Sequence, residues 1–355
     1  MTPTPVFDGH NDFLLRLLND PAAREHTWLS GNGEGHLDLP RMRKGGFAGG
    51  FFAIYIHSPD SEDGIDSDGL MDNPSYELPL PEALDINYAQ PIALSMLGHL
   101  QWMERVSGGE FCICRTVEEI KASLKRGSIA AIIHMEGAEA IGPDLDALYS
   151  FHAMGLRSLG PVWSRPTAFG HGVPFRFPGD PDIGPGLTAA GKELIKTCNE
   201  LGIMIDLSHL NEKGFDDVAS LSDAPMVATH SNAHAITPSP RNLTDRQLSV
   251  IRDTGGIVGL NFATIFLRPD GRRSGDMTLE PVLRHLDHLI EHLGEDHVGL
   301  GSDFDGALVP NPISDVAGLP VLVDALQNHG YSTTLMNKLC HENWLTLLQK
   351  TLKEP

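Results

Sequence analysis

Short apolar runs alternate along the chain with longer segments in which apolar residues recur every three or four positions. The short runs have the length and composition of buried strands, whereas the longer segments are typical of amphipathic helices. Eight strands are predicted, at residues 5–12, 47–56, 129–134, 155–162, 204–209, 226–228, 256–262 and 297–301. Helices are predicted at residues 86–106, 117–126, 187–201, 211–221, 245–254 and 278–293, with two more between 315 and 352.

This alternation predicts the fold class. Strands separated by helices form parallel sheets, and eight such units are the number that closes into a (β/α)8 TIM-type barrel. The 355 residues show no shift in composition and no internal repeat, so we expect a single domain over residues 1–355. Residues 58–85 interrupt the pattern as a long acidic loop insertion without periodicity, and the C-terminal helices are expected to close the barrel.

Polar residues able to bind a metal stand where several predicted strands end. His10 and Asp12 are two positions apart, so in an extended segment they face the same side. The others come at the ends of the third, fifth, sixth and eighth strands: Glu136, His209, His230 and Asp303. In a closed barrel these strand ends surround one cavity. Imidazole and carboxylate groups are usual metal ligands, and a glutamate can bridge two ions, so the pattern predicts a metal centre.

Other polar residues are expected to lie outside this centre. His234 is four residues after His230, but no glutamate follows His230 as a zincin-type helix requires. Glu139 is predicted to belong to a loop or to a helix start. The four cysteines lack the spacing of a zinc site and are predicted to be buried free thiols in a reducing cytosol: Cys112, Cys114, Cys198 and Cys340.

Composition narrows the range of partners. Acidic residues number 47 against 26 basic ones, a formal net charge of −21, which argues against nucleic acid and anionic membrane surfaces as partners. The start of the chain lacks the charged and apolar regions of a signal peptide, and no apolar run approaches the roughly 18 residues of a membrane span. We therefore expect a cytoplasmic protein with no nucleic-acid or membrane partner.

The motifs at the strand ends resemble those of the renal (membrane) dipeptidase family of zinc peptidases, within the metallo-dependent hydrolase superfamily. The resemblance covers nearly the whole chain and is closest to a soluble member of bacterial type. The matching motifs lie at residues 7–12, 135–137, 206–209, 229–231, 239–242, 301–306 and 342–344.

The resemblance implies a binuclear site with two Zn²⁺ per chain. One ion would be held by His10, Asp12 and Glu136, and the second by Glu136, His209 and His230. Arg241 matches the family arginine that binds the C-terminal carboxylate of the substrate, and Asp303 matches the catalytic acidic residue near the metals.

The implied reaction is hydrolysis of dipeptides with a free C-terminal carboxylate by a metal-bridging hydroxide. The substrates would be small dipeptides, L-Xaa-D-Xaa as well as L,L, and we expect the enzyme to be a homodimer. Two other functions stay open. One is a related amidohydrolase that acts on N-acyl amino acids or lactams, and the other is a catalytically silent binding protein that keeps the pocket.

The chain departs from the family pattern after the fourth strand. Members such as the renal enzyme have a substrate-contacting histidine there, whereas this chain has Trp163. Trp163 is predicted to be a substrate-binding residue. It would either form a wall of the pocket or donate a hydrogen bond from its indole N–H, which can donate but cannot accept. The renal enzyme also has a histidine where this chain has Glu139.

Overall fold

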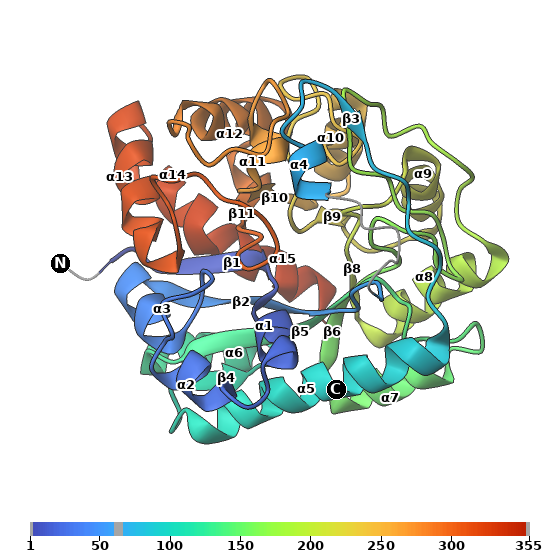
Figure 1. The fold of residues 1–355 in the computed structure, drawn as a ribbon, viewed down its shortest axis with the longest axis horizontal. Helices are drawn as coiled ribbons and strands as arrows, with labels where there is room; N and C mark the ends of the chain where they lie inside the picture. The colour runs from blue at the N-terminus through green and yellow to red at the C-terminus, as the bar shows by residue number, and fades with distance from the viewer. Residues whose placement is uncertain (1–2, 60–66, 353–355) are drawn as a thin grey trace.

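The computed structural model describes residues 3–59 and 67–352, and its centre is a parallel β-barrel (Figure 1). Eight strands of the described chain form the barrel, in the spatial order β8-β6-β5-β2-β1-β11-β10-β9. Their bounds are β1 Val6–Asn11, β2 Phe47–Tyr55, β5 Ile129–Glu136, β6 Leu156–Gly160, β8 Met204–Ile205, β9 Val227–Ala228, β10 Ile257–Asn261 and β11 Val298–Gly301. A parallel bridge between Asp206 and Val227 joins β8 to β9 and closes the barrel, which confirms the predicted fold class.

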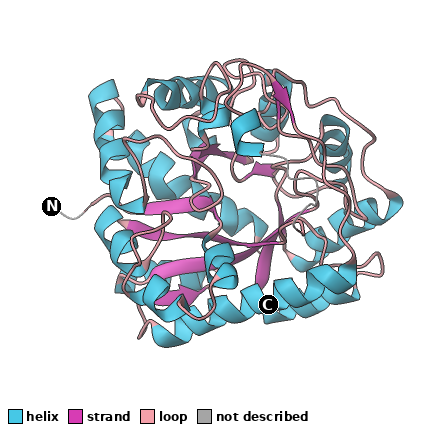
Figure 2. Ribbon diagram, viewed as in Figure 1, coloured by secondary structure: helices cyan, strands magenta, loops and turns pink. Residues whose placement is uncertain are grey.

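Helices surround the strands, as Figure 2 shows. The six predicted helices between residues 86 and 293 are α5 Ile86–Val106, α6 Val117–Arg126, α8 Ala189–Leu201, α9 Glu212–Leu221, α10 Asp245–Asp253 and α12 Glu280–Leu293. Threonine side chains cap three of them by accepting a backbone N–H of the first turn: Thr116, Thr188 and Thr244. The C-terminal segment forms α13 Leu319–His329, α14 Thr333–Asn337 and α15 Asn343–Thr351. None of the helices in the described ranges is long and apolar enough to cross a membrane.

The structure adds elements that the sequence pattern missed. Short helices occupy Phe13–Asn19 (α1), Arg24–Leu29 (α2), Leu39–Gly45 (α3) and Asp146–Met154 (α7). Each spans about two turns, too few for a periodic pattern to stand out. Strand β4, Phe111–Ile113, pairs with the first half of β5, while β6 pairs with its second half. Its three residues could not be distinguished from a loop by alternation.

Residues 60–66 of the predicted long loop at residues 58–85 lie outside the described residues, and two short elements that the prediction missed interrupt the rest of it. Helix α4 covers Ser67–Leu70, and strand β3, Tyr76–Glu77, pairs antiparallel with β7, Arg176–Phe177. The partner of β3 is about a hundred residues away in sequence, so no local signal marks this strand.

The amino end of the barrel is filled with apolar side chains, which leaves the opposite end for the polar residues. Trp344 of α15 enters between the strands and donates from Nε1 to the Leu300 carbonyl at 3.0 Å. A Cβ at Gly299 would fall 2.5 Å from the Trp344 ring and one at Gly259 3.0 Å from it, so both strands need glycine at these positions. Phe7 and Phe51 belong to the same cluster.

Candidate metal centre and active site

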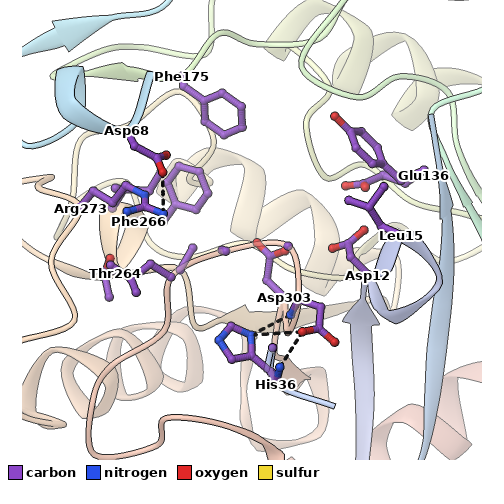
Figure 3. A pocket seen from close by; sticks show the side chains of 18 of the residues that line it. Asp12, Leu15, His36, Asp68, Glu136, Phe175, Thr264, Phe266, Arg273 and Asp303 are labelled. Atoms are coloured by element: carbon purple, nitrogen blue, oxygen red, sulfur yellow. Dashed lines mark hydrogen bonds and ion pairs between the residues drawn. The ribbon is translucent and has the colours of Figure 1, made fainter. Parts of the chain in front are cut away.

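The carboxyl end of the barrel brings the six predicted site residues together. All six are buried, and four of them line one cavity of about 670 Å³: Asp12, Glu136, His209 and Asp303. In Figure 3, Asp12, Glu136 and Asp303 surround this cavity, with Phe175 and Phe266 across from them. The ends of different strands thus supply one site, as the barrel topology predicts.

Glu136 lies between two sets of nitrogen ligands. Its Oε1 is 3.0 Å from His209 Nε2 and 3.4 Å from His230 Nε2, whereas its Oε2 is 3.7 Å from His10 Nε2. Asp12 Oδ2 lies 3.2 Å from the same His10 nitrogen. Each carboxylate oxygen of Glu136 therefore faces a different histidine group, which is the arrangement a bridging carboxylate needs.

Hydroxyl groups orient the two histidines that face Oε1. Ser164 Oγ lies 2.8 Å from His209 Nδ1, and Thr229 Oγ1 lies 2.8 Å from His230 Nδ1. Thr229 also donates to Asp206 Oδ2 at 2.6 Å, because a carboxylate can only accept. The hydroxyl has a single hydrogen, so His230 Nδ1–H must donate to Thr229. The Nε2 lone pair of His230 is then free for a metal.

Electrostatics in the centre favour a cation. Burial raises the pKa of Glu136 well above its usual range; His10 opposes the shift, and Asp12 and Asp303 add to it. Burial lowers the pKa values of His209 and His230, which keeps both imidazoles neutral. Divalent metals bind neutral imidazoles and ionised carboxylates. A bound cation would therefore offset the repulsion between the carboxylates that adds to the raised pKa of Glu136.

His10 is the exception among the histidines. Burial opposes a charge on it, but the Glu136 and Asp12 carboxylates outweigh burial and raise its pKa to about 10. A metal ion bound to the same carboxylates would take the place of that proton. Two atoms of this group, His10 Nδ1 and Asp12 Oδ1, have no hydrogen-bond partner among the described residues. The donor set therefore fits a metal.

Asp303 is held in a strained loop next to these ligands. Its backbone has φ +60°, and Asn261 Nδ2 donates to its Oδ2 at 2.9 Å. A Cβ at Gly306 would fall 2.1 Å from Asp12 Oδ2 and 2.5 Å from Asp303 Oδ1, so only glycine leaves room for the two carboxylates. Burial raises the pKa of Asp303, which suits a group that exchanges a proton.

Arg241 is buried beside the cavity. Its Nη2 donates to the His230 carbonyl at 3.2 Å, and its guanidinium lies 5.2 Å from the ring centroid of Phe266, a residue of the cavity wall. Burial lowers its pKa to about 10, although Asp303 and Glu136 oppose the shift. Arg241 Nε lacks a partner in the part of the chain that the structure describes.

Trp163 lines the cavity, as predicted, and it contacts residues that the sequence analysis did not connect with it. Its ring centroid is 5.1 Å from that of Tyr55 and 5.9 Å from that of His209. The guanidinium of Arg165 lies 4.7 Å from its centroid, and Arg165 Nε is 3.6 Å from Glu139 Oε1. Glu139 lies in the turn after β5, within the predicted loop, and forms a buried ion pair with Arg165 there. His234 is not in the cluster, since its Nε2 pairs with the Gly179 carbonyl at 2.8 Å.

Sequence reasoning missed three groups that shape the centre: Asn261, Ser164 and Thr229. Asn261 is the last residue of β10, so the strand-end argument that found Glu136 also applies to it. Thr229 and Ser164 gave a weaker signal, because hydroxyl residues are common at strand ends and only the fold brings them to a histidine ring.

Comparisons with known proteins agree with this site. A family model described as membrane dipeptidase (peptidase family M19) matches residues 1–354. The fold superposes with a TM-score of 0.97 on a metallo peptidase from Rhodobacter sphaeroides liganded with a phosphinate mimic of the dipeptide L-Ala-D-Ala; identity is 67%, over 98% of this chain and 99% of that one. It also matches dipeptidase AC, a metallo peptidase of family M19, with a TM-score of 0.97 and 66% identity over 99% of both chains.

A curated relative, an uncharacterized protein in the pqqA 5′ region of Klebsiella pneumoniae, is 49% identical over 248 residues, which are 70% of this chain and 92% of that protein. The barrel and its cluster of imidazole and carboxylate groups define a metal-dependent hydrolase. The chain belongs to the membrane dipeptidase family, peptidase family M19, and is a metallodipeptidase. The predicted family and enzyme class are thereby confirmed.

Proposed function

We propose that the protein is a binuclear zinc dipeptidase that hydrolyses dipeptides with a free C-terminal carboxylate, L-Xaa-D-Xaa as well as L,L. The observation that carries the binuclear part is Glu136, whose two oxygens face separate histidine groups. His10 and Asp12 would hold one Zn²⁺ with Glu136, and His209 and His230 the other. When bound, the two ions supply an activated water and polarise the peptide carbonyl.

The residues of the chain orient the substrate and move the proton. Arg241 binds the free carboxylate through guanidinium N–H groups, a charge-assisted contact that an internal peptide bond of a protein cannot make. Asp303 takes the proton of the attacking water and returns it to the leaving amine. Asn261 donates to one Asp303 oxygen, which leaves the other oxygen for this exchange.

The inclusion of L-Xaa-D-Xaa dipeptides among the substrates is supported by the Rhodobacter sphaeroides protein, whose phosphinate ligand mimics L-Ala-D-Ala. The charge of the lining does not separate a dipeptide from an N-acyl amino acid, because Asp12 and Glu136 would be neutralised by metal, while Asp305 and Asp68 pair with Arg16 and Arg273. Turnover decides between these two substrate classes.

A turnover screen tests this function. Zinc-loaded protein is assayed with L,L and L,D dipeptides beside N-acyl amino acids and lactams. We expect cleavage of dipeptides and little turnover of the other substrates. Faster cleavage of N-acyl amino acids or lactams would assign the chain to the alternative amidohydrolase activity, and no turnover of any substrate would favour a binding protein.

The expected cytoplasmic location and homodimer stay predictions. Fractionation of the source cells tests the first, and light scattering of the zinc-loaded protein tests the second.

A further inference from the structure

Tyr55 and Trp163 stand together on the cavity wall that faces the metal centre. Both line the same cavity as Glu136 and His209. Tyr55 ends β2, and its Cα pairs directly with that of Glu136 on β5. The parallel register therefore places the phenol and the central carboxylate at the same level of the barrel, one strand apart.

A buried arginine contacts both aromatic residues. Arg165 is fully buried, with its guanidinium near the Trp163 ring and 3.6 Å from the Glu139 carboxylate. Its Nη2 donates to the Tyr55 hydroxyl at 3.4 Å, and its Nε and Nη1 have no hydrogen-bond partner among the described residues. Burying a charge that is only partly hydrogen-bonded is costly, so this arrangement suggests a role beyond packing.

The contact with Arg165 fixes what the Tyr55 hydroxyl can do. An arginine can only donate, so the phenol oxygen is the acceptor and its own hydrogen is left for another partner. Burial raises the pKa of Tyr55, although the Arg165 charge opposes the shift, so the phenol keeps its proton. A neutral phenol whose oxygen accepts from a cation is a stronger donor than an isolated one.

We propose that Tyr55 is a catalytic residue that donates a hydrogen bond to the carbonyl oxygen of the scissile peptide, and that Arg165 is its positioning residue. The inference rests on the proposed dipeptidase function. As the water oxygen bonds to the carbonyl carbon, the π electrons move to the carbonyl oxygen, and the Tyr55 hydrogen bond shortens without proton transfer. When the C–N bond breaks, an oxyanion lone pair re-forms the C=O bond, and the C–N electron pair leaves with the amine nitrogen, which takes its proton from Asp303.

The same geometry assigns Trp163 a different part. Its ring lies among Tyr55, Phe175 and the guanidinium of Arg165, so it is held in place as a wall between the arginine and the cavity. Of the two roles that the sequence left open for Trp163, the structure favours the wall, because the polar support that a donor needs is directed at Tyr55.

The test compares Tyr55→Phe with Trp163→Phe in the zinc-loaded full chain. We expect Tyr55→Phe to lower kcat for L-Ala-D-Ala about 100-fold, the size of effect seen when one oxyanion donor is removed, with KM changed by less than about threefold. Affinity for a phosphinate mimic of L-Ala-D-Ala should fall by a similar factor, because its tetrahedral oxygen imitates the developing oxyanion. Trp163→Phe should lower kcat less than Tyr55→Phe does.

Two controls separate this effect from others. Tyr88→Phe removes a phenol that donates to the His57 carbonyl and does not line the cavity, and it should leave kcat unchanged. Zinc content of Tyr55→Phe should equal that of the parent. Parent-like kcat and phosphinate affinity in Tyr55→Phe, or a loss confined to KM, would overturn the proposal. A parent enzyme that cleaves only N-acyl substrates would instead contradict the dipeptidase function, and the Tyr55→Phe comparison would then be made on those substrates.

Discussion

Thr229→Val is expected to weaken the metal site of His209 and His230 while leaving the shape of the strand end intact. Valine is close to threonine in size but cannot hydrogen-bond. The change removes the 2.6 Å bond to Asp206 and the 2.8 Å bond from His230 Nδ1. His230 then loses the contact that fixes its tautomer and ring orientation, and the Asp206 oxygen is left buried without that donor.

The expected loss follows from these two contacts. A hydrogen bond to a charged group contributes about 1.5–3 kcal/mol, and loss of an outer-sphere partner of a metal ligand typically lowers affinity about 10- to 100-fold. Since tenfold corresponds to about 1.4 kcal/mol, the two estimates agree on roughly 1.4–2.8 kcal/mol. The loss should fall on one zinc equivalent, because the Thr229 hydroxyl bonds to His230 and Asp206 and not to the proposed ligands of the other ion, His10 and Asp12.

Competition with a chromophoric chelator measures the affinity of each zinc equivalent. We expect one equivalent to bind as in the parent and the other 10- to 100-fold more weakly. Thr351→Val is the matched control, because Thr351 is buried in α15 and its hydroxyl donates to backbone carbonyls of its own helix. Parent-like affinity for both equivalents in Thr229→Val, or equal weakening of both, would refute the orienting role.

Three further changes test the site and its surroundings. Glu136→Gln should lose at least one of two bound metal equivalents by elemental analysis, and full occupancy would contradict the bridging role. Arg241→Ala should raise KM for dipeptides roughly 10- to 100-fold but barely affect a dipeptide amide, and equal losses would show that Arg241 does not read the carboxylate. Burial lowers the pKa of His285 from 6.5 to about 3, so the folded state holds this imidazole neutral. The contribution of neutral His285 to the free energy of unfolding is present above pH 6.5 and is lost as pH falls towards 3. Between pH 6.5 and 5, the free energy of urea unfolding of metal-free His285→Gln should therefore fall by about 1.6 kcal/mol less than that of the parent, and an unchanged pH dependence would contradict this assignment.

Most residues of the site could be predicted from sequence, because each follows a recognisable strand and the barrel places the ends of all its strands on one face. A strand end is visible in a few residues, and closure of the sheet brings every strand end to one face. His10, Glu136 and Asp303 needed only this rule. His209 also obeyed it, although β8 ends at Ile205 and His209 is reached through a turn in which its own φ is +70°. The turn changes the backbone path to the His209 ring, but the ring still lies on the face formed by the carboxyl ends of the strands.

The short elements could not be predicted because their stabilising contacts are not local. Strand β3 has two residues and depends on β7, and helix α1 has seven residues, which bury Phe13, Leu14 and Leu17. Isolated elements of this length are marginal in water, so tertiary contacts decide whether they form. The spacing of apolar residues along the sequence does not report those contacts.

The buried Arg165–Glu139 pair shows a different limit of sequence reasoning. The sequence predicts a loop or a helix start at Glu139, and Glu139 does lie in the turn after β5, but the local pattern does not show that its side chain is buried. Whether a charge is buried depends on whether a partner with the opposite charge reaches it, and here the partner is 26 positions later, on the segment after β6. Neither residue alone carries that information. The pair becomes visible only when the barrel places the end of β5 beside the end of β6, and the same juxtaposition brings the Arg165 guanidinium to the Tyr55 hydroxyl. The residue proposed to touch the reacting carbonyl is thus the one whose role depends most on tertiary structure. The proposed metal ligands, which lie at or shortly after the ends of β1, β5, β8 and β9, depend on it least.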